Sequence, residues 1–535
     1  MNNSPLNSPK SISWQDRIGN WNPQLLREIR GKLKLRNLVV AIGLSLLFQL
    51  LLLLFYSQRV PNEDCYIQAR GFGCVASWQD WWLEQFRVVT WTEPFILFLA
   101  GVYGLIADLA LEDYKGTLNF IRISPRSSVN ILMGKIMGVP LLAYISVGLT
   151  IPYHLVCALN AKVPLAFLLS FYTLLIGTAF FLFSASILIA LLSGWQAKLG
   201  SQVSAGALIF SFVTFVWVAP SFMWWNIFTV WSSFSKVLVG GRISPIKVEW
   251  WYLPITTNIW TSHIFTIVNL AIFSFAIWRI LQRRFHNPTS TLVSKGQSYA
   301  ITAYLEIAML GFCMQSSFAN MEFANSSEFQ LIMLLLLYIA NCFMFFAAIA
   351  ALTPTRQALL DWVRFGALST TEEHPSGFGY VVRDLIWSDK SPVLIAIALN
   401  LLFTQLPILI WVNSWTSPEI RGKALIVTAS FTISILLIAL IAQLILFLKT
   451  RNPTAWATGT ISALIFLPVS IMLTLSISPD RYAGVWLFFG FPWLVVSNIK
   501  LSDIILAFAG QISVIIALIL QLIYQLQRAK MRDTL

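Results

Sequence analysis

The sequence predicts an all-α integral membrane protein with twelve transmembrane helices, arranged as two six-helix pseudo-repeats. Of its 535 residues, 57% are hydrophobic and only 11% are charged, whereas soluble domains contain about 25% charged residues. The apolar residues gather in runs of about 20, the length that an α-helix needs to cross the ~30 Å hydrocarbon core of a bilayer. Runs of this length argue against a membrane β-barrel, whose strands alternate over about ten residues.

Twelve apolar runs follow one another with no soluble domain between them. The expected spans are 38–56, 88–111, 135–157, 165–192, 202–224, 259–280, 299–317, 329–352, 393–415, 423–448, 455–478 and 503–526. No small-residue cleavage site follows the first run, which indicates an uncleaved anchor rather than a signal peptide. Each half of the chain has six spans, its longest cytoplasmic connection after the second span, and a long outer connection between the fifth and sixth.

The distribution of Lys and Arg predicts the orientation. Of the 36 basic residues, 25 fall in segments on the side of the N-terminus, so the positive-inside rule places both termini in the cytoplasm. The net charge of +13 then follows from the topology and from anionic lipid headgroups. Membrane lipids are therefore expected partners, and no nucleic acid is expected.

The sequence divides into three parts. Residues 1–37 are expected to form a cytoplasmic amphipathic helix, and 38–286 and 287–535 are the two six-span halves. In the first part, apolar residues recur every three or four positions with basic residues between them, which is typical of a helix in the membrane interface, bent at Pro23. This helix serves either as a passive anchor or as a regulatory or partner-binding surface.

The two outer connections, 225–258 and 479–502, are rich in aromatic residues and contain proline. They either dip into the outer leaflet as short broken helices or form an aromatic belt at the membrane surface. Two of the five cysteines, Cys65 and Cys74, lie in another outer loop, 57–87. In an oxidising compartment they can form a disulfide that closes a small loop; otherwise they are two unrelated thiols.

The cytoplasmic connection between the second and third spans reads DYKGTLNFIRISPRSSVNILMGK, from Asp113 to Lys135. Gly116 and Thr117 are expected to start a short helix, with Thr117 as its cap. Apolar side chains follow within two turns, and Pro125 ends the helix. Exposed apolar residues on a cytoplasmic helix indicate a surface that a soluble partner covers.

This segment resembles the first cytoplasmic loop of type-2 ATP-binding-cassette exporter permeases, in which a Gly-Thr-Leu opening, a later Pro and a Gly-Lys before the next span recur. The stretch NPQLLREIRGKLKLRN is similar to their elbow helix. The resemblance covers chiefly the first half of the chain. It implies a coupling helix that docks into a cytoplasmic ATPase, with these residues matching the motif: Gly116, Thr117, Leu118, Phe120, Ile121, Arg122, Pro125, Gly134 and Lys135.

The resemblance implies a permease that moves an unidentified substrate, as an exporter, in a bacterial plasma (inner) membrane. ATP and magnesium would be bound by separate cytoplasmic ATPase subunits, two per chain, and the two halves would rock about a pathway between them. The chain itself has no G-x-x-x-x-G-K-[ST] phosphate loop, so it is not expected to be an enzyme. No cofactor and no metal site is expected within it.

The second half departs from the motif. Its corresponding connection, TPTRQALLDWVRFGALSTTEEHPSGFGYVVRDLIWSDKSP, lacks Gly-Thr-Leu and gains acidic residues. A second coupling helix around Leu359 to Leu368 is expected by position alone. The two halves would then engage their ATPases unequally.

Two other classes compete with this interpretation. An ion-coupled secondary transporter also has twelve spans and an internal repeat; for it, Glu306 within the seventh span is the candidate pathway residue. Glu306 has either a pathway or proton-linked role, or an interfacial or structural one. A membrane-embedded enzyme would need clustered His, Asp or Glu. The four histidines are scattered along the sequence, and the run TEEHP at 371–375 is better explained as a solvated loop.

Overall fold

The computed structural model describes most of the chain. The described residues are 14–61, 77–192, 203–234, 238, 248–256, 258–288, 290–315, 327–368, 378–450, 452–495 and 499–531. Cys65 and Cys74 lie outside them. The chain divides into two compact units, Met1–Ile246 with Ile255–Pro288, and Lys247–Pro254 with Thr289–Leu535.

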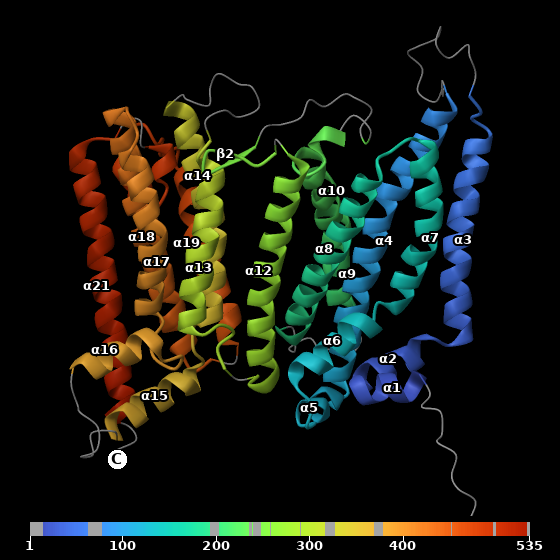
Figure 1. Ribbon diagram of the computed structural model, residues 1–535. Helices are drawn as coiled ribbons and strands as arrows, with labels where there is room; N and C mark the ends of the chain where they lie inside the picture. The colour runs from blue at the N-terminus through green and yellow to red at the C-terminus, as the bar shows by residue number, and fades with distance from the viewer. Residues whose placement is uncertain are drawn as a thin grey trace, which may run out of the picture. The chain divides into compact units, whose positions relative to one another are not determined.

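The first unit is a bundle of long helices with short helices at one end. In chain order its helices are α1 (Trp14–Trp21), α2 (Pro23–Lys32), α3 (Leu35–Ser57), α4 (Trp78–Tyr114), α5 (Thr117–Arg122), α6 (Ser128–Gly138), α7 (Leu141–Asn160), α8 (Leu165–Leu192), α9 (Val203–Val213), the π-helix η3 (Thr214–Val218), α10 (Ala219–Phe228), the 3₁₀ turn η4 (Ser232–Phe234) and α12 (Ile259–His286). Figure 1 shows α1, α2, α5 and α6 gathered at one end of this bundle.

Helix α4 is the centre of the first unit, where it packs against α7, α8 and α9. Its buried residues recur every three or four positions, as in Phe98, Val102, Leu105 and Leu109. This spacing places them on one face of a helix. The same face continues past the apolar region to Glu112, so α4 connects the core of the bundle directly to the short helices at its end.

The second unit begins, in sequence, with a hairpin. Its elements are the strands β1 (Glu249–Trp250) and β2 (Leu253–Pro254), followed by α13 (Lys295–Cys313), α14 (Ser327–Leu352), α15 (Arg356–Leu368), α16 (Phe378–Trp387), α17 (Leu394–Asn413), α18 (Pro418–Phe447), α19 (Pro453–Thr474), α20 (Ala483–Phe488), the 3₁₀ turn η6 (Pro492–Leu494) and α21 (Leu501–Met531). Helix α18 contacts α14, α17, α19 and α21. It therefore holds this bundle together.

The hairpin lies between α10 and α12 in sequence but packs on α13. Its two strands are antiparallel, with Trp250 opposite Leu253. The backbone N–H of Trp251 donates to the carbonyl of Gly311 at 2.9 Å, and Trp250 Nε1 donates to the carbonyl of Ala308 at 3.1 Å. A side chain at Gly311 would overlap both indole rings, so glycine allows the hairpin to approach α13 this closely.

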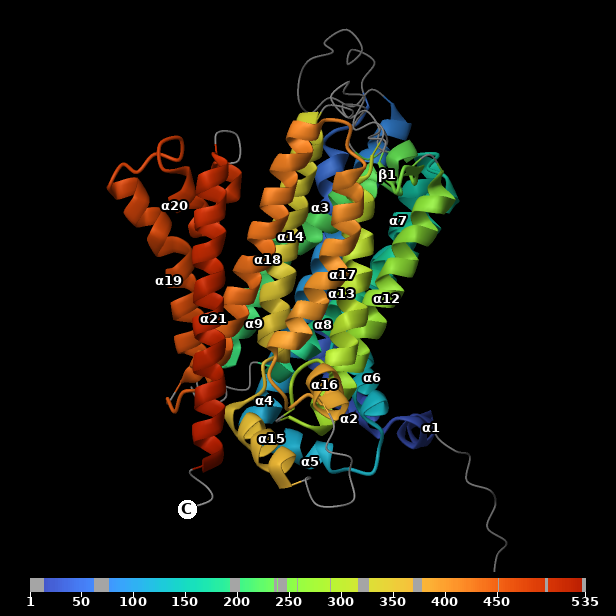
Figure 2. The ribbon, with the colours of Figure 1, turned by 90° about the vertical axis from the view of Figure 1, so that its left-hand side faces the viewer.

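Within the described residues, eleven helices are long and apolar enough to cross a membrane, one fewer than the twelve expected. The missing span, 299–317, falls on α13. This helix has sufficient length but carries buried polar side chains along one face, including Ser298, Thr302 and Glu306. Figure 2 shows α13 standing beside α17, against which it packs. Its polar residues face other helices, which explains why its composition is less apolar than that of a lipid-facing span.

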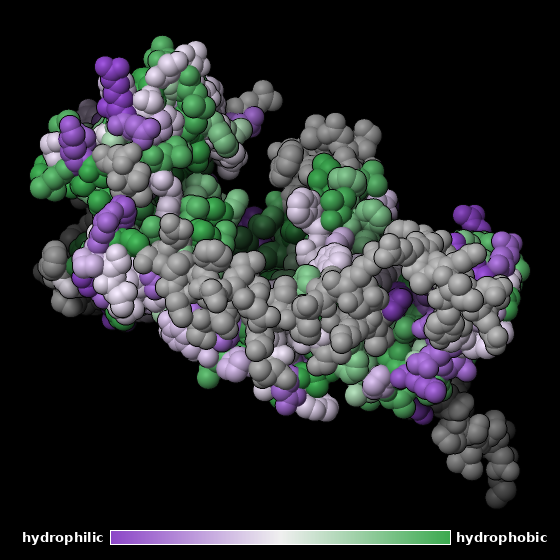
Figure 3. Space-filling view, turned by 90° about the horizontal axis from the view of Figure 1, so that it is seen from above, coloured by the Kyte–Doolittle hydropathy of each residue, from purple (hydrophilic) through white to green (hydrophobic). Residues whose placement is uncertain are grey.

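The two aromatic outer connections contain ordered structure. Residues 479–502 include the short helix α20, and Trp486 in it is 1% exposed, with its Nε1 donating to the carbonyl of Ile477 at 3.0 Å. In the first connection, Trp231 is fully buried. Figure 3, seen from above, shows hydrophilic residues in small groups with apolar residues beside them. At least part of each connection is therefore packed into the protein.

Candidate functional site

The short helix α5 begins at Thr117, directly after a glycine in a left-handed conformation. Gly116 has a φ of 73°, which a residue with a Cβ adopts only at a cost. The hydroxyl of Thr117 donates to the carbonyl of Glu112 at 3.1 Å. Thr117 is thus the first helical residue and bonds back to α4, rather than capping α5 as expected. The helix ends at Arg122, three residues before Pro125.

Helix α5 has two different faces. Leu118 is 3% exposed and packs in the core of the first unit, with Ile121 partly buried beside it. Phe120 and Ile123 are 78% and 79% exposed. The guanidinium of Arg122 lies 5.8 Å from the ring centre of Phe285 in α12. One side of α5 is therefore attached to the bundle, while the other presents apolar side chains to the surroundings.

Two glycines of α6 allow α2 to pack closely against it. A Cβ on Gly134 would lie 2.6 Å from Asn22 Oδ1 and 2.9 Å from the backbone nitrogen of Leu25, and a Cβ on Gly138 would overlap the side chain of Glu28. This is a small-xxx-small pattern that brings helix backbones together. Asn22 caps α2 by accepting from the N–H of Leu25 at 2.9 Å, and its Nδ2 donates to the carbonyl of Asn130 at 2.7 Å.

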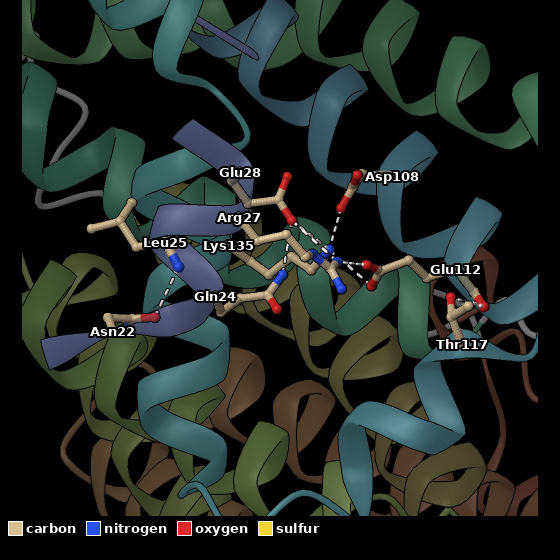
Figure 4. A network of polar contacts seen from close by, with 9 residues as sticks. All are labelled: Asn22, Gln24, Leu25, Arg27, Glu28, Asp108, Glu112, Thr117 and Lys135. Carbon is tan, nitrogen blue, oxygen red and sulfur yellow. Dashed lines mark hydrogen bonds and ion pairs between the residues drawn. The ribbon is translucent and has the colours of Figure 1, made fainter. Parts of the chain in front are cut away.

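Lys135 lies at the centre of a buried ion network next to α5. Its ammonium contacts Glu28 Oε1 at 3.2 Å and Glu112 Oε2 at 2.8 Å, and it also contacts Asp108. Arg27 pairs with Glu112 and with Glu28, the latter at 3.3 Å. Figure 4 shows Lys135 pointing between carboxylates that come from α2 and α4. The network therefore connects three helices, α2, α4 and α6.

The carboxylates determine the charge state of the central lysine. Lys135 is 1% exposed. Burial acts to lower the pKa of Lys135, but Asp108, Glu112 and Glu28 outweigh it, so that the pKa is raised. The pKa of Arg27 is also raised: burial opposes this, and Glu112 and Glu28 outweigh it. Both cations remain charged at neutral pH and hold three acidic groups together.

The same three carboxylates have a spacing that a metal ion could use. One oxygen from each of Glu28, Asp108 and Glu112 lies within 4.8 Å of the others. The ammonium of Lys135 lies among them and bonds to all three. In this arrangement the lysine occupies the cation position, and the cluster acts as a structural joint.

The second unit has a helix at the position expected for a second coupling helix. Helix α15 covers Arg356–Leu368, and its Leu359 is fully buried. Trp362 Nε1 donates to the carboxylate of Asp384 in α16, and Arg356 Nε donates to the carbonyl of Phe447 in α18 at 3.1 Å. Helix α15 is therefore attached to two neighbouring helices. Its role in coupling stays a prediction.

A buried polar chain in the first unit was missed by the sequence reasoning, which treated the histidines as scattered. Glu93 Oε1 accepts from Thr150 at 2.6 Å and from Tyr172 at 3.2 Å. The Tyr172 hydroxyl lies 2.8 Å from His154 Nδ1, and His154 Nε2 lies 2.9 Å from the Thr90 hydroxyl. Polar residues spaced by three in α4 and by four in α7 were the available signal.

Glu306, the expected pathway residue, is fully buried in α13. Within the described part of the chain, its two carboxylate oxygens have no hydrogen-bond partner, and neither has the side-chain amide of Asn341. The pathway role of Glu306 stays a prediction, as does the disulfide between Cys65 and Cys74.

Comparisons with known proteins identify no relative. No family model, no curated protein and no solved structure matches the chain. The functional assignment therefore depends on the residues and contacts described above.

Proposed function

We propose that this chain is the membrane-spanning permease subunit of an ATP-binding-cassette transporter, acting as an exporter with separate cytoplasmic ATPase subunits. The observation that carries the proposal is the construction of α5. Phe120 on its outer face and Ile123, directly after its last residue, are exposed, and its inner side is joined to the long helix α4. A partner that pushes on the exposed face would act directly on the bundle.

The ion network beside α5 supports the transmission of such a push. Lys135 connects the beginning of the third apolar run to the end of α4 and to α2. Because one buried cation is shared by three carboxylates, separating any two of these helices leaves a charge uncompensated, which is costly. Helices α2, α4, α5 and α6 would therefore move together. Two ATPase subunits per chain, carrying ATP and magnesium, are part of this proposal.

The test is purification of the tagged chain from its native membrane in mild detergent, with the associated proteins identified and ATP hydrolysis measured. We expect two ATPase subunits per chain. With the double variant Phe120→Asp and Ile123→Asp, the amount of ATPase that copurifies should fall about tenfold. This is equivalent to a loss of ~1.4 kcal/mol in binding free energy. Both residues are exposed, so their replacement should leave the fold intact.

A matched control separates α5 from the rest of this end of the molecule. Trp21 is 59% exposed on α1, and the variant Trp21→Asp should retain the ATPase. Equal loss in the control would show that any added charge has this effect. If no ATPase copurifies while other membrane complexes survive, the proposal is wrong.

An ion-coupled secondary transporter is the second candidate, and the polar chain through Glu93 and His154 favours it. A carboxylate, a tyrosine and a histidine in hydrogen-bond contact within membrane helices are the parts of a proton relay. In this case transport in vesicles should follow an imposed proton gradient without ATP, and Glu93→Gln should abolish it. ATP-dependent transport that Glu93→Gln leaves unchanged would contradict this candidate.

A further inference from the structure

A pocket of about 450 Å³ lies between the short helix α20 and the beginning of α21 in the second unit. Figure 2 shows these two helices side by side, at the end of the unit opposite α15. On α21 the lining residues share one face of the helix, at spacings of three, one and three: Asp503, Leu506, Ala507 and Gly510. The other side is lined by residues 481–485 and Phe488. The pocket therefore combines the charged side chains of Arg481 and Asp503 with an apolar wall.

The wall formed by α20 is fixed to α21. Gln511 is 1% exposed, and its Nε2 donates to the carbonyl of Phe488 at 2.8 Å. A Cβ on Gly510 would lie 2.9 Å from Phe488 Cε2, and a Cβ on Gly484 would lie 3.2 Å from Asp503 Cβ. The two glycines thus allow the helices to approach closely. The pocket is bounded by closely packed, hydrogen-bonded helices.

The pocket is polar at one end and apolar at the other. Asp503 lies in the first turn of α21, whereas Leu506 and Gly510 follow about 5 and about 10 Å further along the helix, at 1.5 Å per residue. Leu506 is 75% exposed. Helix α21 is long and apolar enough to cross a membrane, and the positive-inside rule predicts that it begins on the outer side. The polar end then lies at the level of the outer headgroups, and the apolar end lies in the hydrocarbon.

The polar end has one cation and one anion. In the part of the chain that the structure describes, neither Arg481 nor Asp503 forms a side-chain hydrogen bond or an ion pair. Asp480 and Lys500 are close in sequence but do not line the pocket. A guanidinium binds phosphate oxygens, and a carboxylate accepts from an ammonium group, through charge-assisted hydrogen bonds. The pair is therefore complementary to a headgroup that contains both a phosphate and an ammonium.

We propose that this pocket binds one phosphatidylethanolamine molecule of the outer leaflet, with its phosphate at Arg481, its ammonium at Asp503 and an acyl chain along Val485 and Leu506. A primary ammonium has three N–H donors for the carboxylate. A choline headgroup has none, and a glycerol headgroup leaves the carboxylate without a cation. The pocket therefore selects ethanolamine over both. The proposal does not depend on the ATPase assignment, because it concerns the chain alone.

The test is native mass spectrometry of the purified chain after incubation with vesicles of phosphatidylethanolamine, phosphatidylcholine and phosphatidylglycerol in equal amounts. We expect one retained phosphatidylethanolamine, preferred over each of the other lipids by about tenfold, equivalent to ~1.4 kcal/mol. Asp503→Asn should abolish this preference, and Arg481→Gln should lower the retention of all three lipids. Val485 is 39% exposed, so Val485→Trp should narrow the pocket without disturbing the fold, and should remove the retained lipid.

Matched controls remove the same kinds of charge elsewhere on this side of the second unit. Glu419 and Arg421 lie at the beginning of α18 and do not line the pocket, so Glu419→Gln and Arg421→Gln should leave lipid retention unchanged. Phosphoethanolamine, the water-soluble headgroup, should not displace the lipid at millimolar concentration, because it lacks the acyl chains.

Five outcomes would each overturn the proposal. These are equal retention of the three lipids, a preference that survives Asp503→Asn, unchanged retention in Val485→Trp, an equal loss in the two control variants, and displacement by phosphoethanolamine. The last outcome would indicate a site for a soluble zwitterion in place of a lipid.

Discussion

Each unit of this protein contains a fully buried lysine, and the two lysines have opposite surroundings. Lys135 in the first unit and Lys295 in the second are both 1% exposed. The ammonium of Lys135 contacts three carboxylates. That of Lys295 donates to neutral oxygens: the carbonyl of Leu385 at 2.7 Å, the hydroxyl of Ser391 at 2.6 Å and the carbonyl of Pro392 at 3.1 Å.

The difference appears in the pKa values. For Lys135, the carboxylates overcome burial and the pKa is raised. For Lys295, which precedes the expected seventh span, burial lowers the pKa to about 8, although Asp384 and Asp389 act to raise it. Equal burial therefore has opposite outcomes, because carboxylates in direct contact compensate the ammonium and neutral oxygens do not. The first unit depends on a charged joint, whereas the second encloses a cation that folding disfavours.

The largest expected effect is that of removing the charged joint. Lys135→Met should lower the free energy of unfolding by about 3–5 kcal/mol, because it leaves buried carboxylates with Arg27 as their remaining partner in the network. The matched variant Lys295→Met should cost about 1–3 kcal/mol, since it leaves only neutral acceptors without a donor. Denaturation in mixed detergent micelles measures both. Equal losses in the two variants would remove the contrast between the units.

A double variant sharpens this result. Combining Lys135→Met with Glu112→Gln should recover part of the stability, because it removes a carboxylate that the lysine no longer compensates. If the second substitution recovers no stability, the loss in Lys135→Met is caused by the shape of the methionine side chain and not by the uncompensated carboxylates.

The pH dependence of the unfolding free energy should differ between Lys295 and Lys135. The pKa of Lys295 is about 8 in the folded protein and 10.5 without the protein environment. Between these values the unfolded chain binds more protons, so stability rises with pH, by about 2 kcal/mol from pH 8 to pH 10. Below pH 8 the cost of the buried charge is fully present. Lys135, whose pKa is raised, contributes stability that is fully present below 10.5, its pKa without the protein environment, and that is lost as the pH rises from there through its folded pKa.

The measurement is the difference in unfolding free energy between the wild-type chain and Lys295→Met at several pH values from 7.5 to 10. The unfolding free energy of the wild-type chain, relative to that of Lys295→Met, should increase as the pH increases. A constant difference would show that Lys295 titrates normally.

The smallest effect concerns the packing that supports the charged joint. Gly138→Ala should destabilise the first unit by at least about 1 kcal/mol, because the new methyl group would overlap the side chain of Glu28 and push α2 away. Gly148→Ala, at an open position on α7, should be neutral or slightly stabilising, since alanine favours helices. Equal behaviour of the two variants would mean that α2 is not held closely against α6.

Much of the fold could be predicted from the sequence, because apolar runs and proline positions are local signals. The long helices follow the runs, and a short helix occurs before Pro125 as expected. Within the described residues, eleven of the twelve expected spans are helices long and apolar enough to cross a membrane. Hydrophobic spacing alone did not show that α13 places Thr302 and Glu306 against other helices.

The ion network could be predicted only in part. The resemblance pointed to Gly134 and Lys135, but the partners of Lys135 lie 107 positions away at Glu28 and 27 away at Asp108. Nothing in their local sequence indicates that these groups meet, since charged residues at the ends of spans are common. The small residues of α6, four positions apart, were the signal for a close helix contact.

The hairpin of residues 249–254 has a consequence for the order in which the protein is made. It is synthesised before α12, yet its binding partner Gly311 follows Pro254 by 57 positions. At about 5–20 residues per second, the hairpin waits roughly 3 to 11 seconds for α13 to emerge. If the chain were expressed as two polypeptides divided near residue 288, the hairpin would belong to the first polypeptide and its partner helix α13 to the second. We therefore expect the second polypeptide to lack the first structural element of its unit.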